Sequence, residues 1–202
     1  MAVGARVVVG IALVACGAQG SDLIDAVQSD DAGAIRAALA DGDELDERHE
    51  GGQTALMWAC LRGKPNAVRA LLAAGADVRV GEAQGYTCAH GVGFQGRAEL
   101  VPILAEHGLD LSDLHDDGFA PLHRACWGTT PRHTATVVAL LEAGVPPDQP
   151  SKDGRRPLEH AQASATRDVL EAALRGAALE QLQREAAQMA AAHMAAVHKG
   201  EL

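Results

Sequence analysis

Cysteine and histidine are the residues here with the most chemical potential, because they act as nucleophiles, bases and metal ligands. The chain of 202 residues has 4 Cys and 9 His. Cys88 and His90 are too close in sequence to suggest a nucleophile and its base, and no third residue is placed to orient them. We therefore expect no catalytic pair at this position.

A metal site needs several ligands that converge on one point. His193 and His198 are five residues apart in an alanine-rich segment, so they point in different directions, and no carboxylate or thiolate joins them. The sequence also lacks a phosphate-binding glycine loop, a nucleophile elbow and the paired-histidine motif of metalloproteases. We predict a protein that is not an enzyme and has no metal, cofactor or small-molecule substrate.

The composition limits the class of protein and partner. Close to half of the residues (48%) are hydrophobic, but only 2% are aromatic, so the side chains suit thin, closely spaced layers of helices. The net charge of −10 disfavours nucleic acids and anionic membranes, since binding to phosphates depends on Lys and Arg. We expect a protein partner, and the acidic stretches 43–50 and 113–117 favour a basic one. Acidic loops also serve as ordinary solubilising surface.

The two ends of the chain carry possible targeting signals. Residues 1–20 contain Arg6, nine apolar residues at 7–15 and small residues before Ser21, which predicts a signal peptide cleaved after Gly20. Nine apolar residues are too few to span a bilayer, which needs about 20. With the final K-G-E-L at 199–202, this favours the secretory pathway, either the endoplasmic reticulum lumen or secretion. A bacterial lipoprotein acylated at Cys16, or a frayed or buried apolar N-terminus, are the alternatives.

One pattern recurs along the chain at an interval of 33 residues. It begins at Thr54, Thr87 and Ala120 as T-A-L-M-W-A-C, T-C-A-H-G-V-G and A-P-L-H-R-A-C, and R-P-L-E-H-A-Q follows from Arg156. The second half of each unit ends at Gly75, Gly108 and Gly144, residues suited to ending a helix in the left-handed conformation. Each unit therefore reads as two short helices that bury their apolar faces only by stacking on neighbours.

These units resemble ankyrin repeats, in which a T-P-L-H start is followed by V-x-x-L-L-x-x-G-A-D. The resemblance implies an all-α solenoid over residues 21–174, with units at about 22–50, 51–83, 84–116, 117–152 and 153–174. The first unit lacks the T-P-L-H start, and we expect the last to lack its closing glycine. The resemblance also implies structural hydrogen bonds from His90 and His123, at the last position of the motif.

Residues 175–202 are rich in residues that favour helix, and we expect them to form a separate C-terminal helix and tail. The apolar stripe in 175–198 caps the open end of the array or pairs with another helix, or the segment is a solvated tail. Pairing would make the protein a structural scaffold that self-associates, which is our alternative function.

The three cysteines beyond Cys16 read as small core residues. Cys60 and Cys126 occupy the same repeat position two units apart, too far for a disulfide, and Cys88 is at the opposite end of its helix from that position. We therefore expect no disulfide among the three.

The resemblance implies that a partner docks on the loop tips and the concave face of the first helices. The corresponding positions, just before each first helix and just before the glycine in mid-repeat, are Gln53, Leu61, Arg62, Tyr86, Phe94, Gln95, Phe119 and Trp127.

Four of the five aromatic residues fall at these positions, which favours docking, although the rings could instead pack against their neighbours. If they dock, Tyr86→Ala and Trp127→Ala abolish partner capture without lowering thermal stability. The insertion at 128–134 is expected to lengthen the turn within the fourth unit and either to shape the lip of the groove or to be neutral.

Overall fold

The structure, a computed structural model, describes residues 22–49, 51–176, 187–189 and 191. Both predicted targeting signals, Cys16, His193 and His198 lie outside these residues, as does nearly all of the predicted C-terminal helix. Residues 187–189 and 191 are helical. Within the described ranges the chain is helical and contains no β-strand, so the predicted all-α class is confirmed.

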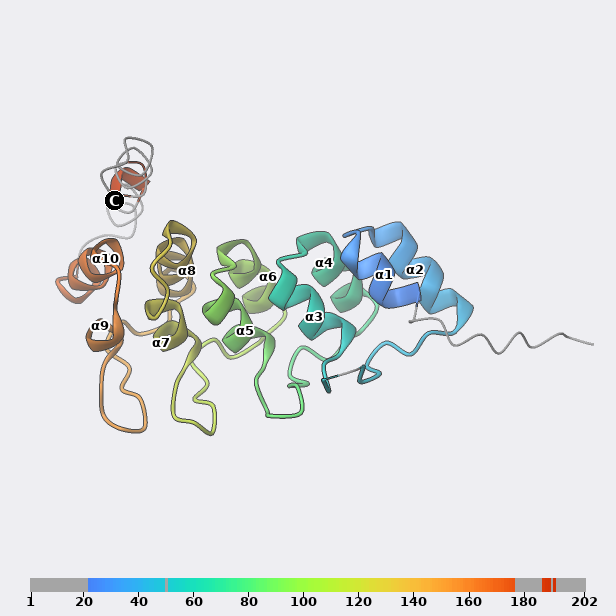
Figure 1. Cartoon of the computed structure of the whole chain (residues 1–202), viewed down its shortest axis with the longest axis horizontal. Coiled ribbons are helices and arrows are strands. Elements are labelled where there is room, and N and C mark those ends of the chain that lie inside the picture. Colours follow the sequence, from blue (N-terminus) through green and yellow to red (C-terminus); the bar gives the residue numbers. More distant parts are fainter. Residues whose placement is uncertain (1–21, 50, 177–186, 190, 192–202) are drawn as a thin grey trace, which may run out of the picture.

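The helices form pairs that follow one another in a row (Figure 1). Loops between successive pairs project to the same side of the row, where they make up the loop tips. The pairs are α1 (Asp22–Gln28) with α2 (Ala32–Asp41), α3 (Ala55–Arg62) with α4 (Pro65–Ala73), α5 (Cys88–Gln95) with the 3-10 helix η1 (Ala98–Leu100) and α6 (Val101–Glu106), α7 (Pro121–Cys126) with α8 (Pro131–Glu142), and α9 (Pro157–His160) with α10 (Ser164–Leu174).

The first helix of each pair begins as its residues predict. The Thr54 hydroxyl accepts a hydrogen bond from the Met57 N–H at 3.2 Å, which caps α3. In α5, Nδ1 of His90 instead accepts from the Thr87 N–H at 3.3 Å, and Nε2 donates to the Asp113 carbonyl at 3.1 Å. The predicted structural role of His90 is confirmed, because it ties its own helix start to the next loop.

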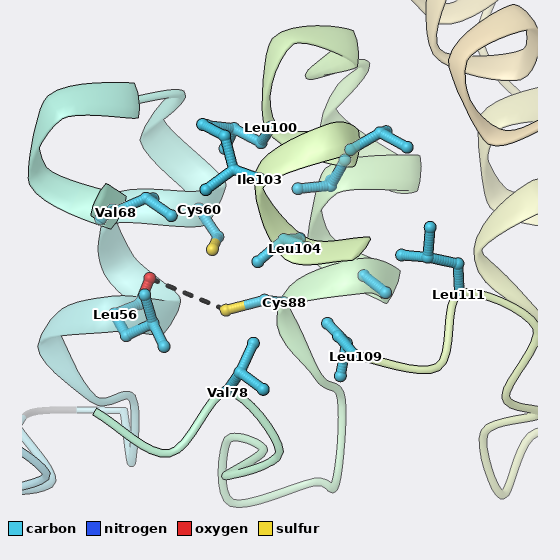
Figure 2. Packing of buried hydrophobic residues seen from close by; sticks show 14 of the residues in the cluster. Leu56, Cys60, Val68, Val78, Cys88, Leu100, Ile103, Leu104, Leu109 and Leu111 are labelled. Atoms are coloured by element: carbon cyan, nitrogen blue, oxygen red, sulfur yellow. Dashed lines mark hydrogen bonds between the residues drawn. The ribbon is translucent and has the colours of Figure 1, made fainter. Parts of the chain in front are cut away.

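The core lies between successive helix pairs and consists of small and aliphatic side chains (Figure 2). Cys60, Cys88 and Cys126 are all buried free thiols, as predicted. The Cys88 thiol, at the start of α5, donates to the Leu56 carbonyl, near the start of α3, at 3.8 Å. Successive first helices therefore lie nearly in register along their axes.

The loop tips are tied to one another by hydrogen bonds between neighbouring units. Nε2 of His115 donates to the Gln84 carbonyl at 2.7 Å, and Nζ of Lys152 donates to the Asp116 carbonyl at 2.9 Å. These bonds span 31 and 36 residues of sequence, close to one repeat. They hold the tips in a continuous row beside the first helices.

The last two units differ from the sequence-based expectation. The prediction that the final unit lacks a closing glycine is wrong, because Gly176 follows α10 with φ of 73° and stands seven residues after Val169, as Gly75 stands after Val68. In the fourth unit the extra residues do not all enter the turn. α8 has 12 residues where α4 has 9, so the insertion lengthens the second helix as well as the link before it.

Candidate protein-interaction surface

The first helices and the loop tips before them make one continuous surface, which we call the first-helix face and define as α3, α5, α7 and α9 with residues 51–54, 84–87, 117–120 and 153–156. One residue of each helix occupies the position directly after the motif's last residue. These residues are Trp58, Gly91, Arg124 and His160. Glycine at the second of these positions leaves a gap in a row of large side chains.

A hollow of about 260 Å³ lies at this gap. Its lining consists of Met57, Leu61, Glu82, Tyr86, His90, Gly91, Phe94 and Arg124. Three of the predicted binding residues, Leu61, Tyr86 and Phe94, are therefore brought together in one place. A fourth, Gln53, is connected to this site because its Nε2 donates to Oε2 of Glu82 at 3.0 Å.

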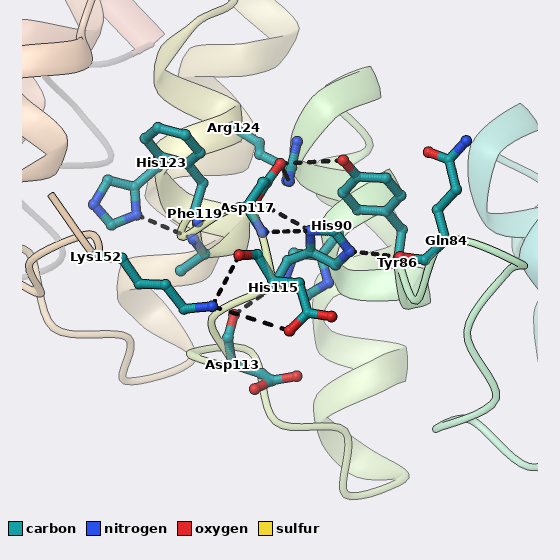
Figure 3. A network of polar contacts seen from close by, with 12 residues as sticks. Gln84, Tyr86, His90, Asp113, His115, Asp117, Phe119, His123, Arg124 and Lys152 are labelled. Atoms are coloured by element: carbon teal, nitrogen blue, oxygen red, sulfur yellow. Dashed lines mark hydrogen bonds and ion pairs between the residues drawn. The ribbon is translucent and has the colours of Figure 1, made fainter.

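Arg124 and Asp117 hold one wall of the hollow in place (Figure 3). The Arg124 side chain is only 7% exposed, and its Nη2 donates to Oδ2 of Asp117 at 2.6 Å. Its guanidinium lies 4.5 Å from the centre of the Tyr86 ring, and the Tyr86 hydroxyl donates to the same Asp117 oxygen at 3.1 Å. The Tyr86 ring also stacks on His115, with centroids 3.7 Å apart. Tyr86 is thus part of a fixed network.

The surroundings of this wall lower the pKa values of Asp117 and His90. Burial raises the pKa of Asp117, but the hydrogen bonds that its carboxylate accepts from Arg124 and from the Phe119 N–H, together with the adjacent His115 ring, outweigh it and hold the pKa well below its usual value. Burial, and then the charge of Arg124, lowers the pKa of His90 to about 4. At neutral pH the wall therefore contains an Arg–Asp ion pair and a neutral histidine.

The predicted residues of the fourth unit pack against one another rather than standing free. The Phe119 and Trp127 rings meet edge to face with centroids 5.1 Å apart, and Phe119 makes a similar contact with His160 at 5.4 Å. Nε1 of Trp127 donates to Nδ1 of His160 at 3.5 Å. Both rings are half-buried. For this pair the structure favours the alternative of internal packing.

Two predicted residues remain open to solvent. Phe94 is 54% exposed at the rim of the hollow, and Arg62 is exposed with its guanidinium 4.5 Å from the Trp58 ring centre. Gln95 is half-buried at the end of α5. The expectation for Tyr86→Ala and Trp127→Ala changes accordingly. Both rings stabilise the array, so either variant lowers thermal stability, and Phe94 and Arg62 are the cleaner probes of binding.

Sequence reasoning did not assign five residues of the hollow to the binding surface, namely Met57, Glu82, His90, Gly91 and Arg124. A signal in the sequence points to Gly91 and Arg124. The residue directly after the motif is Trp58, Gly91 and Arg124 in three successive units, at an interval of 33 residues. Met57 replaces the histidine of the motif. Glu82 belongs to a loop, and only its contact with Gln53 brings it to this surface.

In the part of the chain that the structure describes, no three His, Cys, Asp or Glu side chains are grouped closely enough to hold a metal ion. None of the helices described is long and apolar enough to cross a membrane.

Comparison with known proteins bears on the family. A family model described as ankyrin repeats, in three copies, matches residues 23–113, which covers the first three units. The chain is similar to mitochondrial disaggregase of Bos taurus, with 28% identity over 166 residues, which are 81% of this chain and 24% of that protein. It is 32% identical over 141 residues to E3 ubiquitin-protein ligase Ufd4 of Drosophila melanogaster, covering 66% of this chain and 5% of the ligase.

A third relative is named for the repeats themselves. The ankyrin repeat domain-containing protein SAT10 of Stachybotrys chartarum is 30% identical over 122 residues, which are 60% of this chain and 6% of that protein. The chain thus spans 24% or less of the length of each of these relatives. The family match, the relatives and the row of helix pairs agree, and the chain belongs to the ankyrin repeat proteins.

Proposed function

We propose that this protein binds another protein through its first-helix face and loop tips, and that it has no catalytic activity of its own. Ankyrin repeats generally mediate protein–protein interaction, which supports a protein as the partner. The observation that carries the proposal is the exposure of Phe94 beside an unfilled hollow in a helical surface. An exposed ring next to a pocket is the arrangement from which interface hot spots are built.

The reactive groups nearest this surface are engaged in structural contacts. The Cys88 thiol donates to the Leu56 carbonyl, and both ring nitrogens of His90 are hydrogen-bonded to the backbone. Burial raises the pKa of Cys126 to about 12 and raises that of Cys60 well above its usual value, so neither thiol forms a thiolate readily. These contacts support a binding role over a catalytic one.

The partner we propose is basic, because acidic side chains accumulate along the loop tips. Glu82, Asp113, Asp116 and Asp117 lie along two neighbouring tips, and among the described residues only Asp116 and Asp117 of these four face a basic group within 4.0 Å. The negative electrostatic potential of these carboxylates speeds the approach of a positively charged partner surface. We place the encounter in the secretory pathway on the strength of residues 1–20 and 199–202.

The proposal is tested by affinity capture with the full chain as bait. Wild type is compared with a double variant, Arg62→Ala with Phe94→Ser, and with Leu174→Ser as the matched control. Leu174 is the other large hydrophobic side chain exposed among the described residues, at 40%, and it lies on α10, outside the first-helix face. Retained proteins are quantified by mass spectrometry.

We expect a set of proteins that wild type and Leu174→Ser retain and the double variant loses, with unchanged thermal stability in all three. If the double variant retains the same set as wild type, the first-helix face is not the binding surface. If Leu174→Ser alone loses it, the interface lies on the second helices.

A further inference from the structure

We propose that the hollow at Gly91 is a specificity pocket for a single aliphatic side chain, of leucine or methionine size, in a partner segment that carries lysine or arginine next to it. The inference rests on the proposed function, and it adds the chemistry that the binding surface selects.

The pocket exists because glycine interrupts the row of large side chains on the first-helix face. A methyl group built at Gly91 would lie 3.0 Å from Cδ2 of Leu61 and 3.2 Å from Cε of Met57. Trp58 and Arg124 fill the equivalent positions on either side. A side chain at position 91 would therefore press on Leu61 and Met57, two residues that line the pocket, so glycine at this position sets how these two walls lie.

The walls of the pocket favour an aliphatic occupant. Met57, Leu61 and Phe94 supply its apolar sides, and thioether and aliphatic groups adapt to a side chain that enters between them. A volume of about 260 Å³ is below the range of about 300–1,000 Å³ that is usual for small-molecule sites. One side chain of a protein partner fits this space better than a cofactor or a metabolite.

The polar groups of the pocket favour lysine or arginine next to the aliphatic side chain that enters it. Glu82 lines the hollow and is half-buried, and the described structure gives its Oε2 one donor, the amide of Gln53. The charge of Arg124 is matched by Asp117, which leaves Glu82 as the carboxylate that a cation of the partner can reach. Nε of Arg124 is buried and has no acceptor among the described residues. A main-chain carbonyl of the occupant would supply one.

The test uses the methyl resonance of Met57, and the backbone amide resonances, in the full chain labelled with 15N and with 13C-methyl methionine. Met57 is the single methionine of the repeat array, so its signal reports on the pocket directly. Three capped peptides are titrated, namely acetyl-Lys-Leu-Lys-amide, acetyl-Lys-Ala-Lys-amide and acetyl-Gln-Leu-Gln-amide. We expect the first to shift the Met57 methyl with saturation in the millimolar range, and each of the others to bind at least about three-fold more weakly.

Two variants provide the control. Gly91→Ala is expected to reduce the shift, since the added methyl group presses on Leu61 and Met57 and so changes the walls of the pocket while the helix keeps its fold. Gly33→Ala, a helical glycine of α2 far from the pocket in sequence, is expected to leave the shift as in wild type. Equal affinity for the leucine and alanine peptides, or an unchanged shift in Gly91→Ala, would overturn the inference.

The result also separates this inference from the proposed function. If the lysine–leucine peptide perturbs amides of Tyr86 and Phe94 but not the Met57 methyl, the surface binds peptides without using this pocket. If no resonance shifts with any peptide, the pocket inference is likewise overturned, and the capture experiment with Phe94 and Arg62 decides the proposed function independently.

Discussion

At the scale of single residues, two glycines of the same helix have opposite tasks. Gly91 leaves the pocket open, whereas Gly93 lets two helix backbones approach each other. A methyl group at Gly93 would lie 2.3 Å from the Pro121 carbonyl oxygen, which belongs to the backbone of α7 and cannot turn away. A methyl group at Gly91 meets only the flexible ends of Leu61 and Met57. The same substitution should therefore have different consequences at the two sites.

We predict that Gly93→Ala lowers the free energy of unfolding by about 1–3 kcal/mol, the usual cost of overpacking. Gly91→Ala is the matched control and should change it by less than about 1 kcal/mol, because the gain in helix propensity offsets the small movement of Met57 and Leu61. Urea denaturation of both variants measures the difference. Equal stabilities would mean that α5 and α7 are not in close contact.

His90 gives the array a dependence on pH. Its pKa is lowered from 6.5 to about 4 in the folded state, so below pH 6.5 the unfolded chain takes up the proton first. Stability is then lost as the pH falls from 6.5 to 4. A shift of this size corresponds to about 3 kcal/mol.

We predict that His90→Met, which copies the residue at the equivalent position of the second unit, reduces the loss of stability between pH 7 and pH 4 by about 2–3 kcal/mol. The variant is less stable at pH 7, because it loses the bond to the Asp113 carbonyl. Urea denaturation at several pH values gives both quantities. If the variant loses as much stability as wild type between pH 7 and pH 4, the loss comes from groups other than His90.

Sequence reasoning located the helix starts and ends correctly from Thr54, Gly63 and Gly75, because caps and left-handed turns are local properties. It could not place the Cys88 thiol on the Leu56 carbonyl. That contact depends on how neighbouring helices pack, which a repeat period does not contain. For the same reason it could not foresee that Trp127 packs onto His160 of the next unit while Phe94 has no such cover.

At the scale of helices, the end of one element is often completed by a side chain from another unit. Lys64, at the start of α4, makes no capping bond with its side chain. Asp30, in the turn between α1 and α2, supplies the acceptor instead: its Oδ1 accepts from the Ala67 N–H at 2.8 Å. At the C-terminal end of α3, Nε of Arg97 from the next unit donates to the Leu61 carbonyl at 3.3 Å. Such bonds couple each unit to its neighbour.

We predict that Asp30→Gly lowers the free energy of unfolding by about 1 kcal/mol, the typical cost of a lost cap, and speeds amide exchange at Ala67. Asp30 has φ of 56°, which glycine adopts freely, so the loss reflects the missing acceptor and not backbone strain. Asp30→Asn is the control, since asparagine tolerates this conformation and keeps a side-chain oxygen. Equal losses in both variants would show that the negative charge matters, and not the hydrogen bond.

At the scale of the whole molecule, the array leaves little apolar surface for self-association. Phe94 and Leu174 are the large hydrophobic side chains exposed among the described residues, and they lie on different helices. Isolated apolar side chains do not make the area of about 1,200 Å² that a stable interface needs. The rival scaffold function therefore depends on residues 175–198.

We predict that a chain ending at Gly176 and the full chain both sediment as monomers. Gly176 is the natural end for truncation, because it closes the last helix pair. Analytical ultracentrifugation over a range of concentrations measures both masses. A dimer of the full chain that becomes a monomer on truncation would support the scaffold and not the binding module.

The most direct test of the account is amide hydrogen exchange of the full chain with and without a partner obtained by capture. We predict slower exchange in α3, α5 and α7 and at the tips around Glu82 and Asp116, with α4, α6 and α8 unchanged. Slower exchange confined to the second helices, or to the chain beyond Gly176, would contradict the claim that the first-helix face is the surface that binds.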